Sequence, residues 1–323
     1  MENNKIKKFI YLSVCIVISI ILYLYMCMVV TPKTINDKGG QLYYRGMGFI
    51  AEPANSLDVM IFGNSDVYSG FSPAVLFENY GITSYASGRP SETMKNINPI
   101  LKESLKNQKP DLVILEADCF YSKNSLSPDP ANVLLSPFIY HSRWKEINKK
   151  DFYSLPSRKN SSDINKGFIP STKVYNASEK KGYMGSSDAL PRSLSKDNMS
   201  EVEEFITTCK NNDIPVMLLA LPSPSSWNYG KHNAVKLISE EHNIEFLDMN
   251  VPGKEFKTDL KSDFRDNGNH MNVTGAEKST DYIGKYISSN NLYSFSDKRN
   301  NRKFSKWNNV CKNFNKIKKS VDA

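Results

Sequence analysis

The chain has 323 residues, which is long enough for one large domain or two small ones and for a core that needs no disulfide support. Hydrophobic residues make up 40% and charged residues 24% of it, and these ordinary globular values exclude a wholly disordered chain. The formal net charge is +8, but nine Lys and Arg lie between Lys298 and Lys319 with no acid among them. The rest holds 33 basic and 34 acidic residues, so a basic groove for nucleic acid is not expected.

A long apolar run lies near the N-terminus, where Phe9 to Val30 are 22 residues without a charge. As a helix this run would extend about 33 Å, enough to cross the hydrocarbon layer of a membrane. Three lysines precede it and every face of it is apolar, which argues against a buried helix of a soluble protein. We therefore expect residues 1–31 to be a cytoplasmic tip and a single-pass signal anchor in the cell membrane. The N-terminus would lie inside the cell and the body outside.

Four glycines in residues 32–55 predict a loop-rich connector after the anchor. Five cysteines are spread along the chain, two of them in the apolar run, so neither a disulfide framework nor a zinc site is expected. The sequence contains no glycine-rich phosphate loop and no metal-ligand spacing, so we predict neither a cofactor nor a metal.

Short apolar strands alternate with helical patterns over residues 56–292. Strands are predicted at 57–62, 82–85, 111–116, 215–220 and 244–247. Helices are predicted at 73–80, 90–106, 199–211, 233–242 and 274–287. This alternation implies an α/β fold with a doubly wound parallel sheet whose two faces are covered by helices. In such sheets the chemistry gathers at the carboxyl ends of the strands.

Two segments depart from this pattern. Residues 120–197 are irregular and rich in Ser, Asn, Pro and Lys, and a segment of this length is predicted to be a lid or an insertion. Residues 293–323 contain the basic tail. For the tail we expect a solvated, poorly ordered end, with weak contact to anionic lipid or polymer as the functional alternative.

Ser65 directly follows the first strand and is therefore expected at the carboxyl edge of the sheet. A serine hydroxyl becomes a nucleophile only when a base removes its proton. His270 lies between the last strand and the last helix, at the same expected edge, and Asp263 and Asp266 precede it as acids that could orient its imidazole. A loop histidine without a catalytic role is the alternative. The other histidines are predicted to be surface residues at 232 and 242 and a structural or substrate-contacting residue at 141.

Three sequence blocks together resemble a known family. They are residues 63–73 (GNSDVYSGFSP), 84–88 (SYASG) and 266–276 (DNGNHMNVTGA). These blocks are similar to the first, second and last blocks of the GDSL/SGNH hydrolases. The resemblance is closest to the membrane-anchored bacterial branch related to the D-alanyl transfer protein of lipoteichoic acid and to polysaccharide O-acetyltransferases. It covers roughly residues 50–120 and 200–290.

The resemblance implies an SGNH-type fold with a flavodoxin-like parallel sheet. It implies that Ser65 is the nucleophile and His270 the base. It also implies that the backbone amides of Ser65 and Gly88 donate to the oxyanion, and donors of this kind are typically worth ~3 kcal/mol each in the transition state.

Three positions depart from the family's pattern. Asn64 stands where the first block usually has Asp, although that side chain does not attack the substrate. Asn267 stands three residues before His270, where the family has its acid, so we assign that role to Asp266, with Asp263 as the alternative. Asp118 occupies the region in which the family's third block places an oxyanion-binding Asn. The hole would then have two donors, or another residue would complete it.

The leading hypothesis is an extracytoplasmic serine esterase or O-acyltransferase that forms an acyl-Ser65 intermediate. Its acceptor would be a cell-surface glycan or a teichoic-acid-type polymer, and the scheme allows for a membrane acyltransferase partner. One alternative is a catalytically decayed, membrane-tethered binding or assembly subunit of an envelope-modification system. Another is a lipid esterase or thioesterase, which would use the anchor to reach lipid. The N-terminal helix would contact membrane lipid, and no nucleic acid partner is expected.

Overall fold

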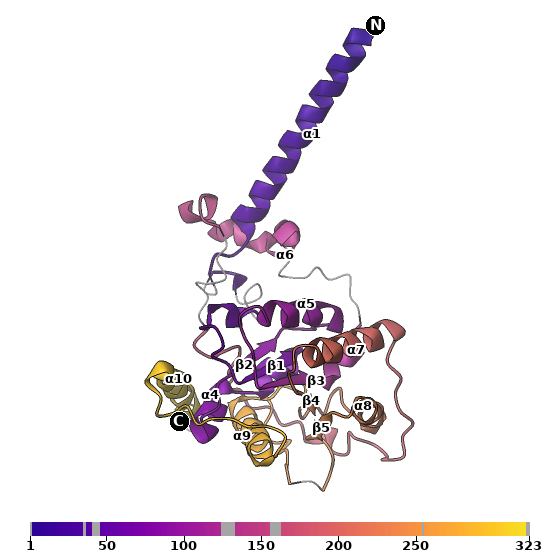
Figure 1. Ribbon diagram of the computed structural model, residues 1–323, viewed down its shortest axis with the longest axis vertical. Coiled ribbons are helices and arrows are strands. Elements are labelled where there is room, and N and C mark those ends of the chain that lie inside the picture. Colours follow the sequence, from indigo (N-terminus) through magenta and orange to yellow (C-terminus); the bar gives the residue numbers. More distant parts are fainter. Residues whose placement is uncertain are drawn as a thin grey trace. The chain divides into compact units, whose positions relative to one another are not determined.

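Five short parallel strands form the sheet that organises the larger part of this protein (Figure 1). The computed structural model describes residues 2–34, 37–40, 46–123, 133–155, 163–253 and 255–320. Parts of the predicted connector (35–36 and 41–45) and of the predicted insertion (124–132 and 156–162) lie outside these ranges. Contacts divide the chain into two units, which are Met1–Arg45 with Ser125–Ser161 and Gly46–Asn124 with Ser162–Ala323.

The strand order in the larger unit is β2-β1-β3-β4-β5, with every neighbouring pair parallel. The strands are β1 (Val59–Gly63), β2 (Ser84–Gly88), β3 (Leu112–Glu116), β4 (Val216–Ala220) and β5 (Glu245–Asp248). This order is that of flavodoxin-like sheets, so the predicted α/β, doubly wound fold is confirmed. The first four strands are buried along their whole length, as expected of a parallel sheet covered on both faces.

Helices cover both faces of this sheet. Helices α5 (Met94–Ser104) and α7 (Lys196–Lys210) lie on one face, whereas α4 (Pro73–Tyr80) and α9 (Val273–Ser289) lie on the other (Figure 1). Helix α8 (Tyr229–His242) packs against β5, and the six-residue helix α3 (Ser65–Gly70) follows β1 after a single residue. Single-turn 3₁₀ helices occupy Gly48–Ala51, Ala117–Tyr121, Ser178–Lys180 and Arg302–Phe304.

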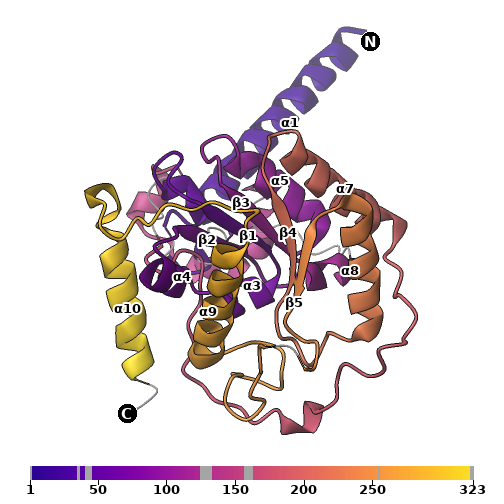
Figure 2. The same ribbon diagram turned by 60° about the horizontal axis from the view of Figure 1, so that its bottom comes forward.

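The C-terminal segment is ordered, so the expectation of a poorly ordered tail is wrong. Helix α10 (Trp307–Lys319) lies beside α4 (Figure 2), where the Trp307 ring stacks on Phe77 with 5.1 Å between ring centroids. Val310 and Phe314 are buried with Trp307, at the spacing of one helix face. The lysines of this segment occupy the other faces. The high net charge of the segment therefore gave no sign that its apolar residues form one face of an amphipathic helix.

The smaller unit contains α1 (Glu2–Val30), within which Asn4–Val30 is long and apolar enough to cross a membrane by length and composition. Helix α6 (Ser136–Ile139) and three 3₁₀ turns pack near the end of α1, and these turns are Val133–Leu135, His141–Glu146 and Lys149–Phe152. The predicted insertion at 120–197 is therefore divided, because 125–161 groups with α1 and 162–197 groups with the sheet. The predicted connector is divided as well, since Gly46 and the residues after it belong to the larger unit.

Candidate functional site

Ser65 is the first residue of α3, immediately beyond the carboxyl end of β1. The preceding Asn64 caps this helix, because its Oδ1 accepts the backbone N–H of Asp66 at 2.8 Å. A Cβ on Gly63 would lie 2.7 Å from the Glu116 Cβ, so only glycine lets β1 turn this close to β3. The local sequence therefore presents a half-buried Ser65 at a helix N-terminus on the sheet edge.

Gly88 ends β2 beside the same turn. It pairs in register with Gly63, and a Cβ on it would lie 2.6 Å from the Asn64 carbonyl oxygen and 3.1 Å from the Tyr68 nitrogen. This contact holds the end of β2 against the backbone that carries Ser65. The structure thus brings together the two residues whose amides are predicted to bind an oxyanion. Their donor roles stay a prediction.

His270 is held by Asp266 through two separate contacts. The imidazole Nδ1 lies 2.6 Å from Asp266 Oδ2, and the His270 backbone N–H donates to Oδ1 at 2.8 Å. Burial raises the pKa of Asp266, but the hydrogen bonds from the side chain and amide of His270 and from the amide of Asn269 outweigh it, so that this pKa is below its ordinary value. The carboxylate is therefore ionised and can orient the imidazole.

Asp263, the alternative acid, contacts other groups. It is fully buried, it pairs with the Lys278 Nζ at 2.7 Å, and it accepts the backbone N–H of Asp259 at 2.7 Å. These contacts tie the loop after β5 to α9, so Asp263 stabilises the loop that carries His270. Of the two acids left open by the sequence, the one in contact with the His270 imidazole is Asp266.

The loop that carries His270 packs against α3, the helix that begins with Ser65. The Tyr68 ring stacks on the His270 ring with 6.3 Å between centroids and 12° between planes. The loop after β4 contacts both α3 and the loop that carries His270. Ser223 Oγ donates to Asp66 Oδ2 at 3.2 Å, and the Ser225 amide donates to the Gly268 carbonyl at 3.0 Å. Among the described residues no hydrogen bond joins the Ser65 hydroxyl to His270. Such contacts commonly tighten only when substrate is bound, and the catalytic roles stay predictions.

No family model and no curated protein matches this chain. Several solved structures are similar to it. A proposed lipolytic protein of the G-D-S-L family from Desulfitobacterium hafniense shares 14% identity over 71% of this chain and 98% of its own, with a TM-score of 0.40. A proposed acylhydrolase from Bacteroides fragilis shares 13% identity over 78% of this chain and 98% of its own, with a TM-score of 0.40. An acetyl-xylooligosaccharide esterase variant from Geobacillus shares 14% identity over 75% of this chain and 99% of its own, with a TM-score of 0.38.

The carboxyl groups of Asp66, Glu116 and Asp118 lie close together near the Ser65 turn, and the sequence did not predict this cluster. Asp66 follows Ser65, Glu116 is the last residue of β3, and Asp118 comes two residues later. The Asp118 amide donates to Glu116 Oε1 at 3.0 Å. Burial, together with the charges of neighbouring acids, raises the pKa of Asp66 and that of Glu116 well above their ordinary values. Asp66 and Glu116 are accordingly held in the neutral form more readily than free carboxyl groups.

Lys231 supplies a cation to this cluster. Its Nζ lies 2.6 Å from Asp118 Oδ1, and both side chains are largely buried. The other carboxyl oxygen of Asp118 accepts the Asn64 amide at 3.4 Å, which connects the ion pair to the Ser65 turn. The sequence raised the concern that Asp118 would repel an oxyanion. The structure reduces this expected repulsion, because the positive charge of Lys231 offsets the Asp118 charge.

We expect Lys231→Met to destabilise the fold by about 3–5 kcal/mol, because it leaves Asp118 buried without its partner. The raised pKa values of Asp66 and Glu116 mean that the folded state binds extra protons above their ordinary values of 3.8 and 4.5. The contribution of these two carboxyls is thus complete below those values and is lost as pH rises through the folded ones. Because the Lys231 charge lowers the pKa of both carboxyls, its removal raises these pKa values further. Urea unfolding should therefore show a larger loss of stability in Lys231→Met near pH 8 than near pH 5.

The matched control for this variant is Lys236→Met on the same helix, whose pair with Glu240 is exposed and should contribute little. The interpretation of the cluster would be wrong if Lys231→Met and Lys236→Met lost the same stability, or if the loss did not depend on pH.

His232 and His242 are half-buried, so their predicted surface positions are wrong. The His232 Nδ1 lies 2.7 Å from Asp248 Oδ2, which also accepts the Trp227 indole N–H at 2.9 Å. This contact ties α8 to the end of β5, and it could not be read from a helix that looks polar in sequence. His141 is exposed in the smaller unit, with its Nδ1 3.0 Å from the Phe138 carbonyl.

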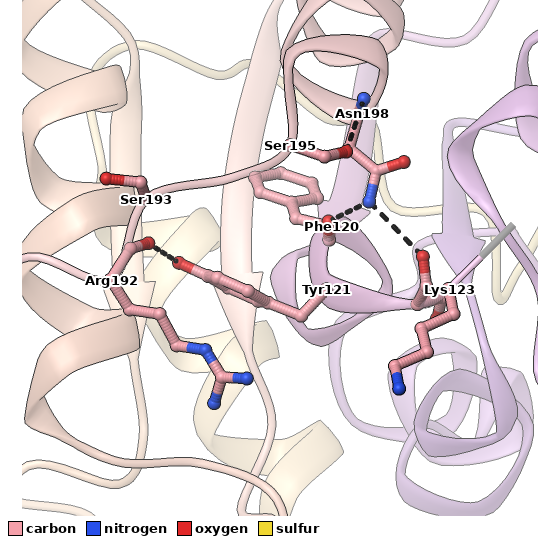
Figure 3. A pocket seen from close by; sticks show the side chains of 8 residues that line it. Phe120, Tyr121, Lys123, Arg192, Ser193, Ser195 and Asn198 are labelled. Carbon is pink, nitrogen blue, oxygen red and sulfur yellow. Dashed lines mark hydrogen bonds between the residues drawn. The ribbon is translucent and has the colours of Figure 1, made fainter.

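A cavity of about 360 Å³ lies at the same edge of the sheet, and Ser65, Gly88 and His270 are not among the residues that line it. It is bordered by the turn after β3 and by the start of α7, and β3 is the neighbour of β1. The Arg192 and Lys123 side chains lie on either side of Tyr121 and extend in the same direction (Figure 3). Neither forms an ion pair with any residue that the structure describes. The cavity therefore presents two positive charges to solvent.

Tyr121 connects this cavity to the acidic cluster. Its ring is contacted by Arg192, 5.5 Å from the centroid, and by the Lys231 Nζ at 4.8 Å. Its hydroxyl donates to the Arg192 carbonyl at 3.1 Å. The cavity and the Ser65 turn are thus joined through Tyr121, Lys231 and Asp118.

Proposed function

We propose that this protein is a serine esterase or O-acyltransferase that forms an acyl-Ser65 intermediate. The observation that carries the proposal is the His270–Asp266 pair in a loop packed on α3, the helix that begins with Ser65. A base oriented by a carboxylate beside a helix-terminal serine is the arrangement that activates a hydroxyl for attack on a carbonyl carbon.

The chemistry follows from the atoms in contact. Because Asp266 accepts from Nδ1–H, the His270 Nε2 keeps its lone pair and can take the proton of the Ser65 hydroxyl. The Ser65 oxygen then bonds to the acyl carbon, and the amides of Ser65 and Gly88 donate to the oxygen that becomes negative. His270 returns the proton to the leaving oxygen as the donor's ester bond breaks. A second hydroxyl, from an acceptor or from water, then takes the acyl group by the same steps in reverse.

The acceptor that we propose is an anionic cell-surface polymer of the teichoic-acid or acidic-glycan type. The cationic cavity formed by Arg192 and Lys123 supports this choice, since it lies on the sheet edge that carries Ser65 and would attract phosphate or carboxylate groups. The apolar helix Asn4–Val30 supports an extracytoplasmic site tethered to the cell membrane, with the lysine-bearing N-terminus inside. A membrane acyltransferase could supply the acyl donor.

The test in cells is mass analysis of surface polymers from a strain with the wild-type gene and a strain with Ser65→Ala. We expect ester-linked acyl groups on one polymer to be lost in the variant strain. Unchanged polymers in Ser65→Ala cells, together with an altered envelope when the whole gene is deleted, would support a non-catalytic binding or assembly subunit instead. Release of fatty acid from vesicles by the purified protein would support a lipid esterase.

The acceptor is tested separately with purified protein. We expect the double variant Arg192→Ala, Lys123→Ala to raise KM for an anionic polymer acceptor and to leave hydrolysis of a small neutral ester unchanged. The difference should shrink at high ionic strength, because salt screens exposed charges. The control is Lys312→Ala, Lys316→Ala on α10, which removes the same net charge from exposed positions. Equal effects of the two double variants would contradict a local acceptor site.

A further inference from the structure

The smaller unit exposes an unusual amount of apolar surface close to the end of α1. Residues 133–155 form a short irregular segment, called the collar below, that packs against the last turns of that helix. Six of its large apolar side chains are 50% to 73% exposed, and these are Leu134, Phe138, Trp144, Phe152, Tyr153 and Leu155. Exposed apolar patches of this kind mark surfaces that contact another apolar phase.

The collar is attached to α1 by hydrogen bonds from the helix's own polar atoms. The Tyr23 hydroxyl donates to the Leu134 carbonyl at 2.6 Å, and the Tyr25 hydroxyl donates to the Phe152 carbonyl at 3.0 Å. Both tyrosines lie inside the apolar stretch that ends at Val30. The collar therefore contacts the candidate membrane span itself and not only the chain after it.

Arg143 fastens the collar to the C-terminal end of the helix. Its guanidinium is buried and donates to the Val29 carbonyl at 3.1 Å and to the Val30 carbonyl at 3.3 Å, which are among the last carbonyls of α1. Asp151 of the collar pairs with the same guanidinium at 2.6 Å. A buried, hydrogen-bonded ion pair gives the collar a defined position on the helix.

The length of α1 then determines where the collar would lie in a membrane. Lys8 is the last charged residue before the apolar run, and Tyr23 follows it by about 22 Å along the helix axis. A hydrocarbon layer is about 30 Å thick, so with Lys8 at one boundary the opposite boundary falls near Met28. The attachment points at Tyr23 and Tyr25 are then on the membrane side of that boundary. Tilting the helix would move them deeper.

We infer that the collar inserts its exposed aromatic side chains into the interfacial layer of the bilayer that α1 enters. This inference rests on the membrane anchor in the proposed function and adds a second contact with lipid. Trp144 and Tyr153 are the residue types that gather at membrane interfaces, since they combine an apolar ring with a polar group. Exposed lysines at 145, 149 and 150 add positive charge that anionic headgroups would attract.

Tryptophan fluorescence offers a direct test, because the chain has three tryptophans and Trp227 and Trp307 are buried. The full chain is reconstituted into vesicles that carry bromine on the lipid acyl chains, either near the headgroup or near the bilayer centre. We expect bromine near the headgroup to quench Trp144 more strongly than bromine near the centre. Iodide in the water should quench Trp144 less in vesicles than in detergent-free buffer without vesicles. A gel first shows that proteolysis has not released the collar unit.

The matched control is Trp144→Phe, which should remove the lipid-dependent quenching and leave the emission of the two buried tryptophans. Sodium carbonate extraction of the same vesicles reports on α1 separately. If the protein resists extraction and Trp144 is quenched by iodide and not by bromine, the anchor holds and the collar inference is wrong. If the protein is extracted, both the anchor and the collar inference are wrong.

A second experiment tests the collar with a variant that keeps Trp144. The double variant Phe138→Ser, Phe152→Ser should increase quenching of Trp144 by iodide in vesicles and leave resistance to carbonate extraction unchanged, because α1 still anchors the protein. Leu190→Ser is the comparison, since Leu190 is 87% exposed and belongs to the larger unit. An equal increase for the two variants would contradict a collar-specific contact with lipid.

Discussion

Ser65→Ala should lower kcat for ester hydrolysis by about 10⁶-fold, which is the scale of loss when a serine hydrolase loses its nucleophile. The variant should also lose covalent labelling by a fluorophosphonate probe. Its stability should be unchanged, because no described residue is hydrogen-bonded to the Ser65 hydroxyl. The measurements are single-turnover kinetics with a chromogenic acetate ester, probe labelling on a gel, and urea unfolding.

Ser305→Ala is the control for this variant, since Ser305 is exposed in the turn before α10 and should keep full labelling. Labelling that survived in Ser65→Ala would place the nucleophile elsewhere. Absence of labelling in the folded wild-type protein would favour the decayed, non-catalytic alternative.

Asp266→Asn should have the second-largest effect, a fall in kcat of about 10⁴-fold, as expected when the acid that orients a catalytic imidazole is neutralised. KM should change little, because Asp266 contacts His270 and not the acyl group. Asp263→Asn should behave differently, since it breaks the buried contact with Lys278. It should lower stability and leave kcat per folded molecule near that of the wild type. Steady-state kinetics and unfolding of both variants separate these outcomes.

The pH dependence provides an independent check of the same pair. The pKa of Asp266 is below its ordinary value of 3.8, so its contribution to stability is present above that value and is lost as pH falls through the lower folded value. The free energy of unfolding of Asp266→Asn should therefore be lower than that of the wild type at neutral pH, and the difference should shrink as pH falls below 3.8. If Asp263→Asn, and not Asp266→Asn, lost activity, the assignment of the acid would be overturned.

The sequence predicted the sheet well because its signals are local. Each strand is a short apolar run, and each intervening helix has apolar residues at helical spacing. Right-handed crossovers then bring the carboxyl ends of the strands to one edge. Ser65 follows β1 and His270 follows β5, so their shared edge could be predicted from chain order. Gly88 could be placed in the same way, because it ends β2.

The partners of these residues could not be predicted with the same success. Asp263 and Asp266 both precede His270, and the turn between them decides which carboxylate meets the imidazole. Lys231 and Lys236 are alike in sequence, yet packing buries one against Asp118 and leaves the other in solvent. The apolar face of α10 was concealed because its basic residues dominate any sum of charge over the segment.

The sequence by itself determined the class of fold, the positions of Ser65 and His270 at one sheet edge, and an apolar helix long enough for a membrane. These follow from periodicity and chain order, which depend on neighbouring residues and on the handedness of crossovers. Tertiary structure alone decided the contact between Asp266 and His270, the pairing of Lys231 with Asp118, and the attachment of residues 133–155 to α1. Those contacts join residues whose meeting depends on how loops pack, and packing is not encoded in any local pattern.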